Sequence, residues 1–319
     1  MWNVLGNLLS RSRRGRRLLI VTYHRVLAEP DELFDEDVDA QLFARQLELF
    51  ATHFNVMRLD EAVARLERGD LPARALTLTF DDGYADNHTV ALPLLRKFGL
   101  SGAFFVASGF LDGRRMWNDT IIEALRRERR PAIDLEDLGV GRLDLSSLPA
   151  RRSAIQNVIR HLKHEPAAAR DAAVARLVER VGQPLPPGLM MTTRQVRELA
   201  DANMLVGAHT VSHPILAATD LAAAEKEIAD GRDQLQAITG APVDAFAYPN
   251  GRPQSDYRAE HVQLVRRLGF RSAVTTAWGY ADGDSNRWQL PRVTPWEANP
   301  GRLHLRLLRA YREPQKLTA

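Results

Sequence analysis

The sequence contains no cysteine. Disulfide bridges, cysteine zinc sites, iron–sulfur clusters and thiol nucleophiles are therefore excluded. No segment approaches the roughly 18 consecutive apolar residues of a membrane-spanning helix, so we expect no such helix. Lysine is scarce, and it occupies only positions 97, 163, 226 and 316 among the 43 basic residues. The net charge is only +3 despite the many arginines, and we expect no nucleic-acid partner.

The remaining composition is that of a globular protein. Of 319 residues, 45% are hydrophobic and 26% are charged, close to the averages for soluble chains. Apolar runs rich in strand-forming residues at 18–23, 75–80 and 102–107 alternate with helical patterns at 38–53 and 88–98. Residues 118–182 interrupt this alternation and predict several short helices and no strand. The alternation then resumes, with helices at 192–203, 220–239 and 255–268 and strands at 204–208, 243–248, 271–276 and 289–293.

This order of elements predicts an α/β fold, because strand–helix–strand units pair their strands in parallel. The number of strands favours a barrel over an open sheet. We divide the chain into a basic N-terminal tail at 1–17, a barrel at 18–295 and a C-terminal helix or tail at 296–319. The barrel contains a helical insertion and linker at 118–188.

The N-terminal tail begins with apolar residues and continues with five arginines between Arg11 and Arg17. A secretory signal has the opposite order, with its charges first. We therefore expect the protein in the cytoplasm or on the cytoplasmic face of the inner membrane. Two interpretations of the tail stay open: a frayed helix with a solvated basic run, or an amphipathic turn in peripheral contact with an anionic membrane surface.

Polar segments come directly after three predicted strands, where reactive groups gather in parallel α/β folds. Asp81 and Asp82 form either a solvated Asp-Asp-Gly turn or a pair that a cation or a catalytic task requires. His209 and His213 have a spacing that lets both imidazoles bind one metal, or they are an ordinary hydrogen-bonded pair. The third segment, 246–251, is either a simple turn or a rigid loop that aims a backbone N–H at an oxyanion.

Together, Asp82, His209 and His213 form a set of two histidines and one carboxylate with positions left for water and substrate. Asp81 stands beside a ligand, where a general base belongs. This combination resembles the polysaccharide deacetylases of the fourth carbohydrate-esterase family, relatives of the rhizobial Nod-factor deacetylases.

Two further segments narrow the resemblance. Tyr23-His-Arg-Val26 and Trp288-Gln-Leu-Pro-Arg-Val293 resemble the branch of bacterial exopolysaccharide and poly-N-acetylglucosamine deacetylases, which implies a role in exopolysaccharide biosynthesis. The resemblance covers about residues 18–110 and 190–295 and leaves 118–182 unexplained.

The resemblance implies a (β/α)7-type distorted barrel with an inserted helical segment. It also implies a bound divalent metal, zinc or a similar ion, and the removal of acetyl groups from an N-acetylated oligo- or polysaccharide. It assigns Asp81 as the base, Asp82, His209 and His213 as the metal ligands, and Asn250 as the donor of an oxyanion-hole N–H.

The sequence departs from the family pattern in two places. Many members carry an arginine in the third motif that orients the base, whereas this chain has Ala247-Tyr-Pro-Asn250 there, and we expect Arg292 to replace it. The late histidine motif that supplies the acid is also weak, because its candidate, His304, lies in an arginine-rich helix. We expect His24 to be the acid instead, since an imidazole donates a proton readily near neutral pH.

Three other functions share single features with this sequence. The main alternative is a non-catalytic carbohydrate-binding protein that retains the barrel. An iron oxygenase uses similar ligands, but its carboxylate usually lies two residues from the first histidine, whereas Asp82 precedes His209 by 127 residues. A nucleic-acid binder that uses Arg11–Arg17 lacks any further motif.

Overall fold

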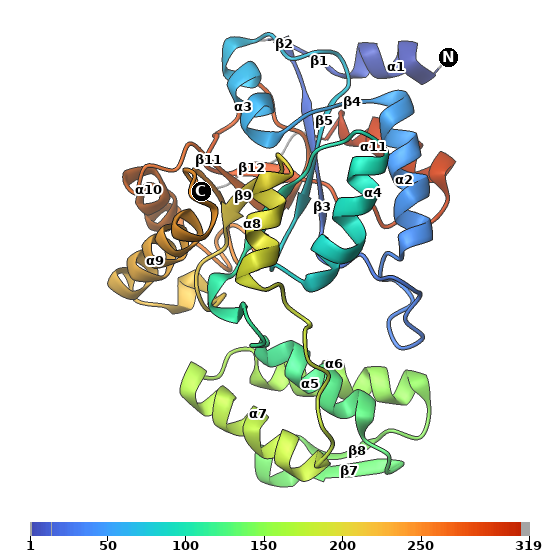
Figure 1. Ribbon diagram of the computed structural model, residues 1–319, viewed down its shortest axis with the longest axis vertical. Coiled ribbons are helices and arrows are strands. Elements are labelled where there is room, and N and C mark those ends of the chain that lie inside the picture. The colour runs from blue at the N-terminus through green and yellow to red at the C-terminus, as the bar shows by residue number, and fades with distance from the viewer. Residues whose placement is uncertain (1, 14, 314–319) are drawn as a thin grey trace. The chain divides into compact units, whose positions relative to one another are not determined.

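The computed structural model describes residues 2–13 and 15–313, and these divide into two compact units (Figure 1). Unit 1 consists of residues 1–28, 38–112 and 190–319, and unit 2 consists of residues 29–37 and 113–189. Each unit has a hydrophobic cluster of its own.

Unit 1 is built on an eight-stranded parallel sheet. Its strands lie in the order β12, β11, β10, β9, β6, β5 and β3, and the short β4 pairs with β5 beside this path. Their bounds are β3 Leu18–Tyr23, β4 Asn55–Val56, β5 Ala75–Phe80, β6 Ala103–Val106, β9 Leu205–Ala208, β10 Ala245–Ala247, β11 Ser272–Trp278 and β12 Leu290–Arg292.

The two ends of this sheet meet. Val293, directly after β12, forms a parallel bridge with Val21 of β3. The Val293 N–H donates to the carbonyl of Ile20 at 2.8 Å, and the Thr22 N–H donates to the carbonyl of Val293 at 3.0 Å. The sheet is therefore nearly closed into a barrel, which confirms the predicted fold class.

Alternating side chains along each strand point to opposite faces of the sheet. One set fills the barrel interior together with helix α3, Leu59–Arg68, and the other set packs under the surrounding helices. On β3, Leu18 and Ile20 belong to the inner cluster, whereas Leu19, Val21 and Tyr23 belong to the outer one. This alternation decides which residues after each strand point into the site.

Helices cover the outside of the sheet (Figure 1). Their apolar faces join the outer cluster, as with Phe43, Leu47 and Phe50 of α2. The covering segments are α2 Ala40–His53, the π-turn Asn87–Ala91 with α4 Leu92–Lys97, α8 Thr193–Asp201, α9 Leu221–Thr239, α10 Ala259–Arg267 and α11 Pro300–Ala310, with short 3₁₀ turns at Ser108–Phe110 and Leu216–Ala218.

The segment interpreted from sequence as a basic tail holds three short elements. They are α1 Trp2–Leu9 and the antiparallel pair β1 Arg11–Ser12 and β2 Gly15–Arg16. No helix in the described parts of the chain is both long and apolar enough to cross a bilayer.

Unit 2 contains α5 Trp117–Arg127, α6 Leu148–Leu162 and α7 Ala167–Val181, as the sequence predicts for this segment. It also contains an antiparallel pair, β7 Ala132–Leu135 and β8 Gly141–Asp144, joined through the 3₁₀ turn Glu136–Leu138. The expectation of no strand here is therefore wrong. Each strand has only four residues and mixes buried with exposed side chains, so neither forms an apolar run.

Candidate active site

The carboxyl ends of the strands bring four of the predicted site residues to the inner side of the barrel. The alternation that places Leu18 and Ile20 inside on β3 continues to His24. The same parity along β5, β9 and β12 puts Asp81, His209 and Arg292 on the inner side. The N–H of Asp81 donates to the carbonyl of Tyr23 at 3.0 Å, so Asp81 and His24 lie at the same height along neighbouring strands.

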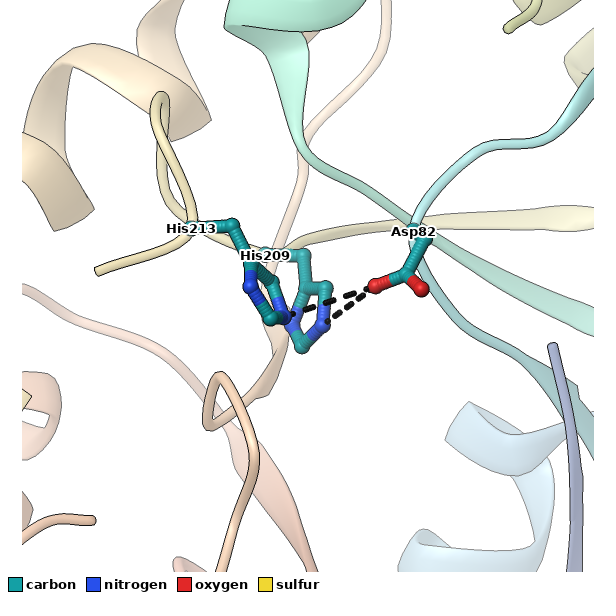
Figure 2. A group of neighbouring side chains, drawn as sticks. All are labelled: Asp82, His209 and His213. Carbon is teal, nitrogen blue, oxygen red and sulfur yellow. Dashed lines mark ion pairs between the residues drawn. The ribbon is translucent and has the colours of Figure 1, made fainter. Parts of the chain in front are cut away.

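Asp82, His209 and His213 converge on one point (Figure 2). Asp82 Oδ1 lies 3.3 Å from His209 Nε2 and 3.4 Å from His213 Nε2. The ligand atoms of the three residues all lie within 4.8 Å of one another. Two strand ends that are 127 residues apart in sequence thus supply one compact group of donors.

The chemistry of this group fits a divalent cation. Asp82 Oδ1 is buried and has no hydrogen-bond partner among the residues that the structure describes. The Nδ1 of His209 lies 2.8 Å from the carbonyl of Ala247, so a proton on Nδ1 leaves the Nε2 lone pair facing Asp82. A buried carboxylate oxygen and two imidazole nitrogens that face it are a set of metal ligands.

The electrostatics of the group follow from burial and mutual charge. Burial alone would raise the pKa of Asp82, but the facing imidazoles outweigh it and hold that pKa well below its usual range. Burial would lower the pKa of His209, but the carboxylates of Asp82 and Asp81 raise it. Burial lowers the pKa of His213 to about 4, so this imidazole is neutral at neutral pH and its lone pair can bind a cation.

The histidine loop, residues 209–213, has a strained backbone. Thr210 and His213 have φ values of 65° and 54°, in the left-handed region that a β-branched residue rarely adopts. The Oγ1 of Thr210 accepts a hydrogen bond from the N–H of His213 at 3.1 Å. The N–H groups of Ser108 and Gly109 donate to the carbonyls of Thr210 and Val211 at 3.2 and 2.9 Å. The loop is therefore fastened to the end of the neighbouring β6.

Helix α9 fastens the same loop from the other side. The carboxylate of Glu227 accepts hydrogen bonds from the N–H groups of Val211 and Ser212 at 3.0 and 2.8 Å, and from the Ser212 hydroxyl at 2.8 Å. A Cβ on Gly231, one turn later, would lie 2.8 Å from the backbone carbon of Thr210. Neither residue is predictable from the sequence, because nothing in their spacing shows which helix packs on the loop.

Asp81 forms a buried, two-point ion pair with Arg292. The guanidinium nitrogens lie 2.7 and 2.6 Å from the two carboxylate oxygens, and the Arg292 Nε donates to the carbonyl of Thr275 at 2.8 Å. Both side chains are almost fully buried. Burial alone would raise the pKa of Asp81, but the charge and hydrogen bonds of Arg292 lower it. Arg292 therefore pairs with Asp81, whereas the third motif of this chain has no arginine that could do so.

His24 faces the same group from the end of β3. Its imidazole lowers the pKa values of Asp81, Asp82 and His213 electrostatically, and its side chain is exposed. Its carbonyl accepts a hydrogen bond from Asn87 Nδ2 at 2.9 Å. The weak candidate His304 is instead stacked on His53 of α2, with ring centroids 4.5 Å apart.

The residues after His24 are held by one carboxylate. Asp86 accepts hydrogen bonds from the N–H of Val26 at 3.1 Å and from the Nε of Arg25 at 2.6 Å. Burial raises the pKa of Asp86, and the charge of Arg25 only partly opposes it. The strand end that carries His24 is therefore anchored by two consecutive residues, Asp86 and Asn87.

Asn250 lies in the tight turn after β10. Asn250 and Gly251 have φ values of 58° and 74°, and the N–H of Gly251 donates to the carbonyl of Pro249 at 2.6 Å. The Thr276 hydroxyl donates to the carbonyl of Asn250 at 2.8 Å. These bonds fix the turn to the end of β11.

The comparison with protein families decides the identity. The family model of polysaccharide deacetylases matches residues 68–273, which is more than half of the chain. This chain belongs to the polysaccharide deacetylase family. Members of the family are hydrolases that act on amide bonds, and this chain is one of them. The family resemblance described from the motifs is thereby confirmed.

Individual relatives are distant but cover most of the chain. The curated protein YxkH of Bacillus subtilis (strain 168), whose name places it among the polysaccharide deacetylases, is 20% identical over 89% of this chain and 73% of its own. The deacetylase PplD of Streptococcus pyogenes, solved in complex with acetate, has a TM-score of 0.62 at 22% identity and covers 94% of this chain and 100% of its own. IcaB of Ammonifex degensii has a TM-score of 0.59 at 19% identity and covers 94% of this chain and 98% of its own. These structures share the barrel fold.

Proposed function

We propose that this deacetylase removes N-acetyl groups from an acetylated amino-sugar oligo- or polysaccharide of the exopolysaccharide class, and that Asp82, His209 and His213 hold the divalent metal it uses. The observation that carries the proposal is the convergence of these three donors beside the Asp81–Arg292 pair. The acetate in the Streptococcus pyogenes relative supports it, because acetate is what N-deacetylation releases.

The chemistry of the donors supports zinc. Zinc takes imidazole nitrogens together with carboxylate oxygens, whereas magnesium is held by oxygen ligands. A bound divalent ion would polarise the acetyl carbonyl and make a water molecule more acidic.

Asp81 serves as the base in this proposal. It lies beside the ligand Asp82, and Arg292 keeps it ionised and fixes the direction of both oxygens. An ionised, oriented carboxylate can take the proton of the attacking water. Arg292 acts through Asp81 and is therefore a positioning residue. The backbone N–H of Asn250, in its fixed turn, donates to the oxyanion that develops on the oxygen of the acetyl group.

His24 serves as the acid. An amide nitrogen must gain a proton before it can leave in water, so the site needs a donor on the side of the sugar. His24 faces the site from the end of β3, is exposed to an incoming substrate and is not part of the metal set. An imidazole can donate a proton near neutral pH.

The proposal is tested by acetate release from N-acetylglucosamine oligomers. The chain should be active as purified, inactive after dialysis against a chelator, and active again after zinc is added. Asp81→Asn should lower the rate by roughly 10²–10⁴ while the metal content stays the same. Asp60→Asn, on the exposed side of α3, is the matched control and should change neither.

Three results would contradict the proposal. Full activity after a chelator has removed the metal would rule out the metal site. Loss of metal in Asp81→Asn would make Asp81 a ligand instead of the base. A chain that binds the oligomers but releases no acetate under any metal would support the non-catalytic alternative.

A further inference from the structure

Helix α1 exposes apolar side chains that the barrel does not use. Val4, Leu5 and Leu8 are 65%, 40% and 53% exposed. Among the described residues, the other large apolar side chains that are exposed are Leu148, Leu221, Trp296 and Leu305. Three of these seven thus lie on one helix of eight residues. A concentration of this kind marks a contact surface more often than single scattered side chains do.

Helix α11 ends beside α1 in unit 1. One guanidinium nitrogen of Arg17 donates to the carbonyl of Leu9, at the end of α1, at 3.0 Å. The same nitrogen donates to the carbonyl of Tyr311, directly after α11, at 2.7 Å. A Cβ on Gly6 of α1 would lie 3.4 Å from Leu308 of α11. The two helices are therefore neighbours, as their labels in Figure 1 also indicate.

The outer side of α11 is basic and partly apolar. Its buried side holds Leu303, Leu307 and Leu308, whereas Arg302, Leu305 and Arg309 are exposed. The spacing of three and four residues puts these exposed residues on one side of the helix. We call Val4, Leu5, Leu8, Arg302, Leu305 and Arg309 the α1–α11 surface.

More arginine and an exposed indole lie near this surface. Arg11 and Arg13 follow α1 and are exposed, as is Arg312 after α11. Trp296, before α11, is 70% exposed, and the Arg306 guanidinium lies 5.0 Å from its ring centroid. Two acids lie here as well, Glu297 at 3.8 Å from Arg306 and Glu313, which accepts from the indole N–H of Trp278, and the arginines outnumber them. The surface is therefore positively charged.

We infer that the α1–α11 surface docks onto an anionic lipid bilayer. Aliphatic and indole side chains with arginines around them suit the boundary between acyl chains and phosphate headgroups. A second copy of the chain fits poorly, because pairing this surface with itself would place arginines opposite arginines. A nucleic acid would match the arginines but leave Val4, Leu5 and Leu8 without a role.

The docked orientation leaves the active site open. Arg17 directly precedes β3, and the Tyr311 hydroxyl donates to the carbonyl of Ala75, the first residue of β5. The surface is thus tied to the amino ends of these strands, and the candidate site lies at their carboxyl ends. The six residues of β3 separate the two by about 20 Å. This inference rests on no step of the proposed function.

The test is co-sedimentation of the full chain with vesicles of phosphatidylcholine alone or with one quarter phosphatidylglycerol. We expect binding to the anionic vesicles, weaker binding at high salt and little binding to neutral vesicles. The double variants Leu5→Asp/Leu8→Asp and Arg302→Glu/Arg309→Glu should each weaken binding by roughly tenfold or more. Leu221→Asp, at a leucine that is 41% exposed on α9, and Arg194→Glu, on the exposed side of α8, are matched controls that should bind like the unmodified chain.

Acetate release from a short soluble substrate should be unchanged in all four variants, which separates this inference from the proposed function. The inference is overturned if the unmodified chain does not sediment with anionic vesicles, or if both double variants sediment as it does. It is equally overturned if the unmodified chain binds no vesicles but forms dimers, and if Leu5→Asp/Leu8→Asp abolishes these dimers. A second copy of the chain would then be the occupant of the surface.

Discussion

Arg292 reaches Asp81 from a different part of the chain than the family pattern suggests. The two residues are 211 positions apart, yet they form a buried pair with two short hydrogen bonds. Burying two charges costs solvation, which only close geometry and further hydrogen bonds recover. The bond from Arg292 to the carbonyl of Thr275 supplies such a contact. What matters for the Asp81 carboxylate is therefore the position of a guanidinium in space, and the strand that carries it can change.

At the same scale, the variant His24→Ala tests whether His24 is the acid or only a packing residue. We expect the release of acetate from N-acetylglucosamine oligomers to fall by roughly 10²–10⁴. Hydrolysis of an activated aryl acetate should fall much less, because its leaving group needs no proton. The measurement compares both rates at equal metal content.

His164→Ala, an exposed histidine of unit 2, is the control for His24→Ala and should leave both rates unchanged. Equal losses on the two substrates would count against the acid role. Loss of metal in His24→Ala would instead assign His24 to the metal set.

At the scale of elements, α9 and the histidine loop are coupled by direct contact. The loop holds two non-glycine residues, Thr210 and His213, at positive φ, which costs conformational energy. Three hydrogen bonds to Glu227 and the close approach of Gly231 keep it there. The position of both histidines therefore depends on a helix that carries no ligand.

Glu227→Gln and Gly231→Ala should each weaken zinc binding by roughly 10–100-fold, the range seen when the partners of metal ligands are changed. Glu227→Gln replaces a carboxylate that accepts three hydrogen bonds on two oxygens by an amide, which has a single oxygen to accept them. In Gly231→Ala, the new methyl group displaces the backbone at Thr210, although alanine ordinarily stabilises a helix relative to glycine. Competition with a chromophoric chelator measures the affinity.

Two neutral substitutions serve as controls for α9. Glu225→Gln changes an exposed carboxylate on the same helix, and Gly301→Ala changes an exposed helical glycine of α11. Both should bind zinc like the unmodified chain. Unchanged affinity in Glu227→Gln would show that the loop keeps its shape without this carboxylate.

The sequence predicts the elements of the barrel well and the contacts between them poorly. The buried strands are continuous apolar runs, so 18–23 and 75–80 are predicted with the observed bounds. Strand parity also explains why residues such as Asp81 and His209 meet inside. By contrast, β7 and β8 are short and half polar, and the contacts of Glu227 and Gly231 depend on how α9 packs, which no local pattern contains.

At the scale of the whole molecule, each of the two units has its own core. The segment 29–37 belongs to unit 2 although it precedes most of unit 1 in sequence. Asp31 accepts a hydrogen bond from the Leu33 N–H at 2.8 Å and pairs with Arg126 of α5 at 2.9 and 2.6 Å. This contact ties the segment to α5.

Asp31→Asn should destabilise unit 2 in a pH-dependent way. Burial opposes ionisation of Asp31, but the hydrogen bonds and charge of Arg126 lower its pKa. Because the pKa of Asp31 is lower in the folded state, its ionised carboxylate stabilises unit 2 at pH values above the ordinary pKa of ~4. This stabilisation is lost as the pH falls through the lowered pKa. We expect faster hydrogen–deuterium exchange in α5 at pH 7, equivalent to about 1 kcal/mol, and a smaller difference near pH 3. Comparing the variant with the unmodified chain at each pH cancels the intrinsic exchange rates.

Exchange in the barrel strands provides the internal control for Asp31→Asn. It should stay the same at both pH values, because the substituted side chain belongs to unit 2 alone. An undiminished difference at pH 3 would show that the charge of Asp31 is not what stabilises the segment.

The pairing of Asp81 with Arg292 also has a consequence for biosynthesis. The ribosome makes the carboxylate of β5 early and its guanidinium partner only with the last strand of the sheet. A nascent chain that has not yet been extended through β12 has the Asp81 carboxylate but not the guanidinium that lowers its pKa. If Asp81 is the base, as proposed, activity begins only when the final strand docks.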